Sequence, residues 1–182
     1  MSTLKVSTIS PLGTDATKTI TLGESGGTLG IASGAKTSGF GKIGQVVQGT
    51  ILSSEFETTS SSFVDTGLSV SITPTSTSSK VLISATCSAL ACATTSTNGR
   101  NIGKIYRDST ALGTDGFELA KIRQDGSYNQ EVGIAASIQL LDTPSTTSAT
   151  TYKLYIQKEA GNFVRIADAG YDAVMQAMEI LD

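Results

Sequence analysis

The residue types that carry acid–base and nucleophilic chemistry are scarce in this 182-residue chain. It has no histidine, so the commonest general base, the Ser-His and Cys-His nucleophile pairs and the commonest zinc ligand are missing. Cys87 and Cys92 are its two cysteines. In a strand their side chains would point to opposite faces, too far apart for a disulfide. We therefore expect unpaired thiols, no metal and no cofactor.

Carboxylates occur singly along the chain, mostly where turn chemistry favours Asp, as at Asp108 and Asp125. A glycoside hydrolase needs two carboxylates facing each other across a cleft, and the spacing indicates no such pair. We expect no enzymatic activity and no catalytic residues. A small glycan-active enzyme built on a jelly roll is the alternative from another functional class.

A glycine pattern at residues 39–44 imitates a cofactor motif. The sequence Gly-Phe-Gly-Lys-Ile-Gly matches the G-x-G-x-x-G of dinucleotide-binding folds. No buried parallel strand precedes it, and residues 45–51 are β-branched and include Gly49, which makes them a poor helix. We interpret the pattern as a flexible neck.

Composition excludes two classes of partner. The net charge is −3 and no basic run is present to match a phosphate backbone, so we expect no nucleic acid. No apolar run approaches the roughly 20 residues of a membrane helix, which predicts no membrane insertion. The first residues lack the apolar region of a signal peptide. The protein is therefore expected to be made in a cytoplasm.

A two-rung repeat at residues 19–34 predicts self-association. Ile20 and Leu22, and then Leu29 and Ile31, each skip one residue and precede a Gly-containing turn. A strand this short, with one apolar face, cannot bury that face alone. Since only about two rungs are present, we expect other chains to cover them in a homo-oligomeric stalk.

From Gln45 onward, apolar segments follow one another in quick succession between turn signals. The predicted strands are 45–52, 68–72, 80–91, 101–106, 117–122, 132–141, 151–158 and 163–166. Eight to ten strands predict an antiparallel β-sandwich or jelly roll over residues 45–182. The odd positions of 80–91, and Tyr152, Leu154 and Ile156, are expected to face the core.

The end of the chain is ambiguous. Residues 172–182 have good helix propensity, and Asp172 could cap a helix. The β-rich context favours a strand instead, because tertiary context overrides propensity.

Three stretches carry a likeness to a known family. They are the opening Met-Ser-Thr-Leu-Lys-Val6, the stem Ile20–Gly34 with Ser38-Gly-Phe-Gly41, and a C-terminal module with Ser79-Lys-Val-Leu-Ile83, Tyr106-Arg-Asp-Ser-Thr110, residues 142–153 and Ala177-Met-Glu-Ile180. Together they resemble short virion fibre or spike proteins of tailed phages, especially marine and cyanobacterial ones. The resemblance implies a homotrimer with an intertwined β stem, a head similar to the tumour-necrosis-factor jelly roll and a final strand at Met178–Leu181. It supplies no catalytic residues.

The resulting hypothesis divides the chain into three parts. Residues 1–18 attach to other virion proteins, 19–44 form the β-repeat stem and Gly-rich neck, and 45–182 form the head. The trimer axis is expected at Ile20, Leu22, Leu29 and Ile31. Such a protein is made in the host cytoplasm and resides in the virion.

Two roles in the virion remain open. In host-surface attachment, loops of the head would bind surface glycan, and the candidate contacts are Tyr128 and Tyr155. For these tyrosines, ordinary rim or core packing is the competing interpretation. The other role is capsid decoration, as a cement or head-fibre protein.

Overall fold

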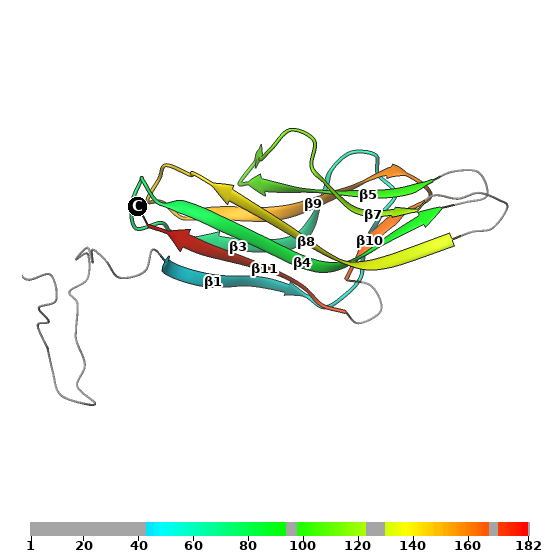
Figure 1. Ribbon diagram of the computed structural model, residues 1–182, viewed down its shortest axis with the longest axis horizontal. Helices are drawn as coiled ribbons and strands as arrows, with labels where there is room; N and C mark the ends of the chain where they lie inside the picture. Colours follow the sequence, from blue (N-terminus) through cyan, green and yellow to red (C-terminus); the bar gives the residue numbers. More distant parts are fainter. Residues whose placement is uncertain (1–42, 94–97, 123–129, 168–170, 182) are drawn as a thin grey trace, which may run out of the picture. The chain divides into compact units, whose positions relative to one another are not determined.

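The structure is a computed structural model that describes residues 43–93, 98–122, 130–167 and 171–181. These residues form eleven strands and, among them, no helix. The strands make two antiparallel sheets, A and B, packed face to face (Figure 1). The predicted all-β antiparallel sandwich is therefore confirmed.

Sheet A is organised around its longest strand. Its members are β1 (Ile43–Leu52), β2 (Phe56–Thr58), β4 (Lys80–Ala93), β8 (Gln130–Asp142), β10 (Val164–Ile166) and β11 (Ala173–Ile180). One edge of β4 pairs first with β11 and then with β10, while its other edge pairs with β8. The sheet consequently has the order β1-β11-β4-β8 at one end and β2-β10-β4-β8 at the other.

Sheet B consists of β3 (Val64–Ile72), β5 (Gly99–Arg107), β6 (Thr110–Ala111), β7 (Phe117–Ile122) and β9 (Thr150–Ala160). Strand β9 lies between β3 and β5, and the far edge of β5 pairs with both β7 and β6. This sheet supplies the second wall of the core.

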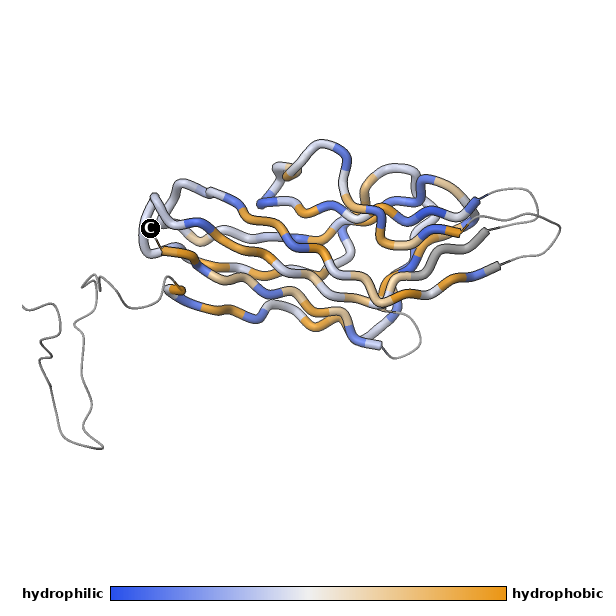
Figure 2. Tube along the Cα trace, in the orientation of Figure 1, coloured by the Kyte–Doolittle hydropathy of each residue, from blue (hydrophilic) through white to orange (hydrophobic). Residues whose placement is uncertain are grey.

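The core lies between the two sheets and follows the predicted alternation. The odd positions of β4 are buried, and they are Val81, Ile83, Ala85, Cys87 and Ala89. Strand β9 contributes Tyr152, Leu154 and Ile156, and these three side chains have no exposed surface. Figure 2 shows apolar residues recurring along the long strands of both sheets. Burial of these side chains is the main stabilising term of the sandwich.

The ambiguous C-terminal segment is a strand. In β11, Ala173, Met175 and Ala177 are fully buried. Both edges of β11 form backbone hydrogen bonds, one with β1 and the other with β4. Two paired edges and a buried face outweigh the small intrinsic preference of these residues for helix, which is a few tenths of a kcal/mol per residue. The family resemblance implies a final strand at residues 178–181. The observed strand β11 includes residues 178–180 but begins earlier, at Ala173, and ends at Ile180.

Other boundaries differ in detail from the predictions. Strand β1 begins at Ile43, and the residues that follow the G-x-G-x-x-G pattern are this strand rather than the helix of a dinucleotide fold. The three-residue β2 and two-residue β6 were not predicted. The predicted attachment segment and the repeat lie outside the described residues.

One edge of the sandwich is closed by contact between β1 and β3, which belong to different sheets. The side-chain amide of Gln45 donates to the Thr73 carbonyl oxygen at 2.7 Å. At Gly49, an added Cβ would lie 2.0 Å from the Ser69 carbonyl oxygen. Glycine is therefore required there by the close approach of the two backbones.

Candidate interaction surface

The outer surface of sheet A carries a block of side chains without charge, which we call the uncharged face. The register across β1, β11, β4 and β8 aligns these residues in three cross-strand rows. The rows are Val46, Met178, Leu82 and Leu141; then Gln48, Gln176, Ser84 and Gln139; then Ile51, Val174, Thr86 and Ser137. Twelve neighbouring positions thus lack any charged group in a chain that is 16% charged.

The first row is the apolar row. Val46 is 60% exposed and Leu141 is 53% exposed, and the half-buried Met178 and Leu82 lie between them. Directly opposed side chains on adjacent strands contact each other, so the row is continuous. A contiguous exposed apolar strip on a sheet is typical of a binding surface rather than of scattered surface hydrophobics.

The rest of the face is polar but uncharged. Gln48, Gln176 and Gln139 follow the apolar row, and each primary amide can both donate and accept hydrogen bonds. The third row brings two further β-branched apolar residues, Ile51 and Val174. The face can therefore bind a protein surface through apolar burial and amide hydrogen bonds.

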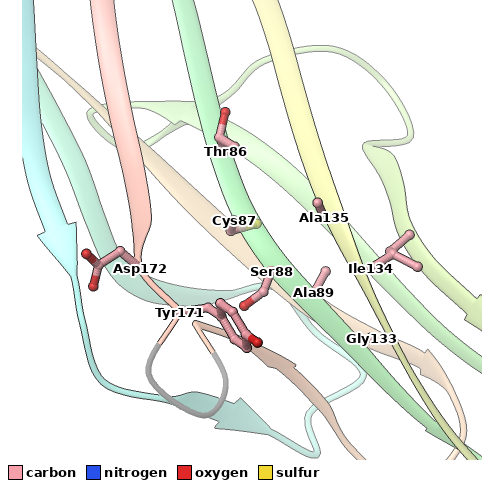
Figure 3. A pocket seen from close by; sticks show the side chains of 9 residues that line it. All are labelled: Thr86, Cys87, Ser88, Ala89, Gly133, Ile134, Ala135, Tyr171 and Asp172. Carbon is pink, nitrogen blue, oxygen red and sulfur yellow. The ribbon is translucent and has the colours of Figure 1, made fainter.

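Two hollows indent this side of sheet A. The smaller, about 170 Å³, lies between the first two rows and is lined by Val46, Leu82 and Met178 among others. The larger, about 500 Å³, is lined by residues of β4, by Gly133–Ala135 of β8 and by Tyr171 and Asp172, which precede β11 (Figure 3). Tyr171 is 68% exposed, so a large aromatic ring on the rim of this hollow is available to a partner.

The outer surface of sheet B is different in character. Arg100 bridges Glu118 at 2.5 Å and Glu159 at 2.6 Å, and Lys153 bridges Asp65 at 2.8 Å. Such partly exposed ion pairs contribute little to stability, but they keep the surface hydrated. Sheet A also carries an ion pair, in which Arg165 of β10 bridges Glu57 of β2 at 2.6 Å, but the twelve positions of the uncharged face carry no charge.

Tyr155, one of the two candidate glycan contacts, lies on this charged surface. Its ring packs on Tyr106 with 4.0 Å between centroids, and Phe63 contacts Tyr106 edge-on at 6.4 Å. One side of the Tyr155 ring is therefore occupied within the protein. Tyr128, the other candidate, lies outside the described residues.

A buried carboxylate anchors the end of the sandwich where β1 begins. Glu179 has no exposed surface. Its oxygens accept hydrogen bonds from Gln45 Nε2 at 2.9 Å, the Thr75 backbone N–H at 2.6 Å and the Thr75 hydroxyl at 2.8 Å. Burial acts to raise the pKa of Glu179, but the donated hydrogen bonds outweigh it, and the pKa lies below its ordinary value.

A polar network joins the two sheets near the end of β8. Asp142 accepts two hydrogen bonds from Arg107 Nη1, at 3.0 and 2.9 Å, and one from the Tyr152 hydroxyl at 2.7 Å. Arg107 and Tyr152 belong to sheet B and Asp142 to sheet A. The network fixes the position of β8 relative to the other sheet, so its role is structural.

The remaining predicted site residues can be placed only in part. The axis residues Ile20, Leu22, Leu29 and Ile31 lie outside the described residues. Within the described ranges no group of three or more acidic or Cys side chains could hold a metal ion. The same ranges contain no helix long and apolar enough to cross a membrane.

Sequence reasoning missed the uncharged face. The apolar Leu82 and Leu90 among the even positions of β4 are a partial signal. The face itself exists only through the register of four segments that lie far apart in the sequence. A one-residue slip of any strand would turn its other set of side chains outward.

Comparison with known proteins does not show a family for this chain. No protein family model matches the chain, and no curated protein matches it. Among solved structures, one of infectious bursal disease virus strain Gx is similar, with 11% identity and a TM-score of 0.33. The VP2 subviral particle of the same virus is similar at 12% identity and a TM-score of 0.33. Each match covers 85% of this chain and 46% of the other, so the chain spans about half of their length.

Proposed function

We propose that this chain is a structural protein of a phage virion, a short trimeric fibre or spike. The observation that carries the proposal is the uncharged face, which has the composition of a protein-contact surface. The β-repeat at residues 19–34, which cannot bury its own apolar side, supports it independently. In this proposal residues 1–18 attach to the virion, 19–44 form the stem, and the sandwich is the head.

The first test is the solution mass of the full chain by light scattering after size exclusion. One chain has a mass of 18.7 kDa, and a trimer has about 56 kDa. A mass near 56 kDa supports a trimeric virion protein. A mass of one chain at all concentrations refutes the trimeric fibre.

The stem variant Leu22→Asp with Leu29→Asp tests the axial residues. Introducing charge on a buried three-fold axis should destabilise the trimer, because each carboxylate would be desolvated next to like charges. The matched variant Thr21→Asp with Thr28→Asp adds the same charges one residue earlier in each rung, where a strand directs side chains to the opposite face. Equal loss of mass in both variants would contradict an apolar axis at Leu22 and Leu29.

Within the virion, we propose that the head serves host-surface attachment. The charged and aromatic outer surface of sheet B, with Tyr155 and Tyr106 stacked beside the Lys153–Asp65 pair, has the residue types that bind sugars. A glycan array with the full chain should give a saturable signal that Tyr155→Ala removes. An array without signal would instead favour the decoration role, and release of sugar from a bound glycan would favour the enzyme alternative.

A further inference from the structure

We propose that β8 is a pairing edge, to which a second copy of this chain adds its own β8 in the antiparallel sense. Sheet A would then continue from one copy into the other across a two-fold axis. The inference goes beyond the proposed function and does not depend on it. The contact is formed in the plane of the sheet, by backbone pairing of two strands, and needs no partner on the outer face of sheet A.

Strand β8 has one open edge. One side of it pairs with β4 at every position from Gln130 to Asp142, without a bulge. Figure 1 shows β8, in yellow, alongside β4. On its other side, no strand of the described chain pairs with it. Roughly half of the backbone N–H and C=O groups of a strand point to each side, so the open edge presents a row of groups that match another strand.

The open edge lacks the features by which proteins keep strand edges apart, which are charged residues, proline and bulges. Residues 132–141 contain neither a charged residue nor a proline. The other edges of the described sheets are short or closed. Strands β2 and β6 have three and two residues, β1 lies against β3, and β7 carries Glu118 and Lys121. Among the described strands, β8 is thus the long edge without protection.

Ile134 indicates that a neighbouring strand is missing at this edge. Ile134 and Ile138 point to the same side of β8, since they lie opposite the buried Ala89 and Ala85 of β4. Ile138 is 2% exposed, whereas Ile134 is 44% exposed. A large apolar side chain on the core side of a sheet would be covered by the opposed side chain of an added strand.

The core-side residues of β8 are complementary to themselves. Isoleucines flank Ala136 on both sides, and Val132 and Leu140 flank the isoleucines. In an antiparallel pair centred on Ala136, Ile134 lies opposite Ile138 of the second copy, and Val132 lies opposite Leu140 of the second copy. The hydrophobic pattern sets the register of a strand pair, and this register keeps all the apolar residues on the core side in both copies.

The same register opposes no like charges. Glu131 lies opposite Leu141 of the second copy, and the two Glu131 residues are about 34 Å apart along the pair. Asp142, the other charged residue of β8, is bound by Arg107 of its own head. Directly opposed like charges destabilise a strand pair, so their absence permits the two copies to pair.

The contact is expected to be reversible. The paired residues 132–140 span about 30 Å, and one strand pair buries less surface than a stable interface does. We therefore expect a dissociation constant of about 10–100 µM, in the range of weak interfaces. Pairing should consequently depend on the concentration of the protein.

The mass of the full chain over a concentration series tests the pairing. Light scattering from about 1 µM to about 1 mM covers the expected range. The mass should double, either from 18.7 kDa to about 37 kDa or, for a trimer, from about 56 to about 112 kDa. Ile134→Lys places a charge at the paired edge and should weaken the doubling at least about tenfold. Val46→Lys is the matched control, because Val46 is also β-branched, 60% exposed and at the opposite margin of sheet A.

Disulfide formation tests the register and does not depend on the folding of Ile134→Lys. Ala135→Cys and Ser137→Cys are made in separate Cys92→Ser chains, in which Cys87 is buried. In the proposed register the two positions are opposed, with Cα atoms about 5 Å apart, within disulfide reach. Two copies of the same position are about 8 Å apart, beyond it. The mixture should therefore form the mixed disulfide at least about tenfold faster than either chain alone forms its own.

The outcomes decide the proposal. Doubling that Ile134→Lys weakens and Val46→Lys leaves unchanged, together with a preferred mixed disulfide, supports the β8 pair. A constant mass over the whole series overturns it. Equal effects of the two lysine variants, or no preference for the mixed disulfide, also overturn it, because another surface then forms the contact. The mass at the lowest concentration reports separately on the trimer of the proposed function.

Discussion

Substitution of Glu179 is the sharpest test of what stabilises the sandwich. Its carboxylate is fully buried. Among the described residues, no Lys or Arg forms an ion pair with it. Its three hydrogen bonds, from Gln45 Nε2 and from the backbone and hydroxyl of Thr75, connect β11 with β1 and with the loop between β3 and β4. Glu179→Ala would leave these buried donors without an acceptor.

The expected loss can be worked from these contacts. A hydrogen bond to a charged group contributes about 1.5–3 kcal/mol, and an orphaned buried donor costs about 1–3 kcal/mol. These terms are not additive, and a net loss of about 3–5 kcal/mol follows for Glu179→Ala. For a head of this size that lowers the melting temperature by roughly 10–15 °C, at about 3 °C per kcal/mol.

Differential scanning calorimetry on the full chain measures this loss, with Glu159→Ala as the matched control. Glu159 loses the same atoms from an exposed ion pair with Arg100, which is worth about 0–1 kcal/mol. If Glu179→Ala melts within a few degrees of Glu159→Ala, the assignment of Glu179 as a structural anchor is wrong.

The pH dependence of stability gives a second readout of the same residue. Because the pKa of Glu179 is lower in the folded than in the unfolded chain, its contribution is fully present above the unfolded value of about 4.5. It is lost as the pH falls through the folded value. Glu179→Gln should therefore flatten the acid side of the stability curve, and an unchanged acid limb would contradict the lowered pKa.

Two further predictions concern single positions in the sandwich. Gly49→Ala should destabilise the head by about 3 kcal/mol, because the added Cβ would overlap the backbone of β3. Denaturant unfolding measures this loss of stability. A loss below about 1 kcal/mol, which is the scale of an ordinary strand substitution, would refute the close approach of the two backbones. Burial raises the pKa of the Cys87 thiol to about 11, so in a Cys92→Ser chain iodoacetamide at about pH 8 should react only after unfolding. Rapid labelling of the folded chain would show that Cys87 is accessible.

The positions of most strands could be predicted from the sequence because apolar residues recur in short segments that turn residues separate. Strand β7 has the predicted bounds, and β9 buries the predicted Tyr152, Leu154 and Ile156. The short β2 was missed because Phe56 is its one apolar residue, and three residues give no period. The helix propensity of residues 172–182 left this segment ambiguous, because propensity does not register the two neighbouring strands that pair with β11.

The candidate surface was less predictable than the fold. Val46, Leu82, Leu141 and Met178 lie in four different segments, and only strand order and register align them in one row. The aromatic residue with an expected role, Tyr155, was identified by type alone. Its stacking on Tyr106 depends on the pairing of β9 with β5, which the alternation of either strand does not specify.

The place of β11 in sheet A has a consequence for how the protein is produced. The strand that comes last in the described chain lies between β1, which comes first, and β4. Sheet A therefore cannot close while residues 173–180 are still inside the ribosome, and β1 must wait for a partner more than a hundred residues away. Such non-local pairing makes folding slow and exposes strand edges during the wait. It also means that a prematurely terminated chain lacks the strand that joins β1 to the sheet, so an incomplete product cannot present the surface on which assembly would depend.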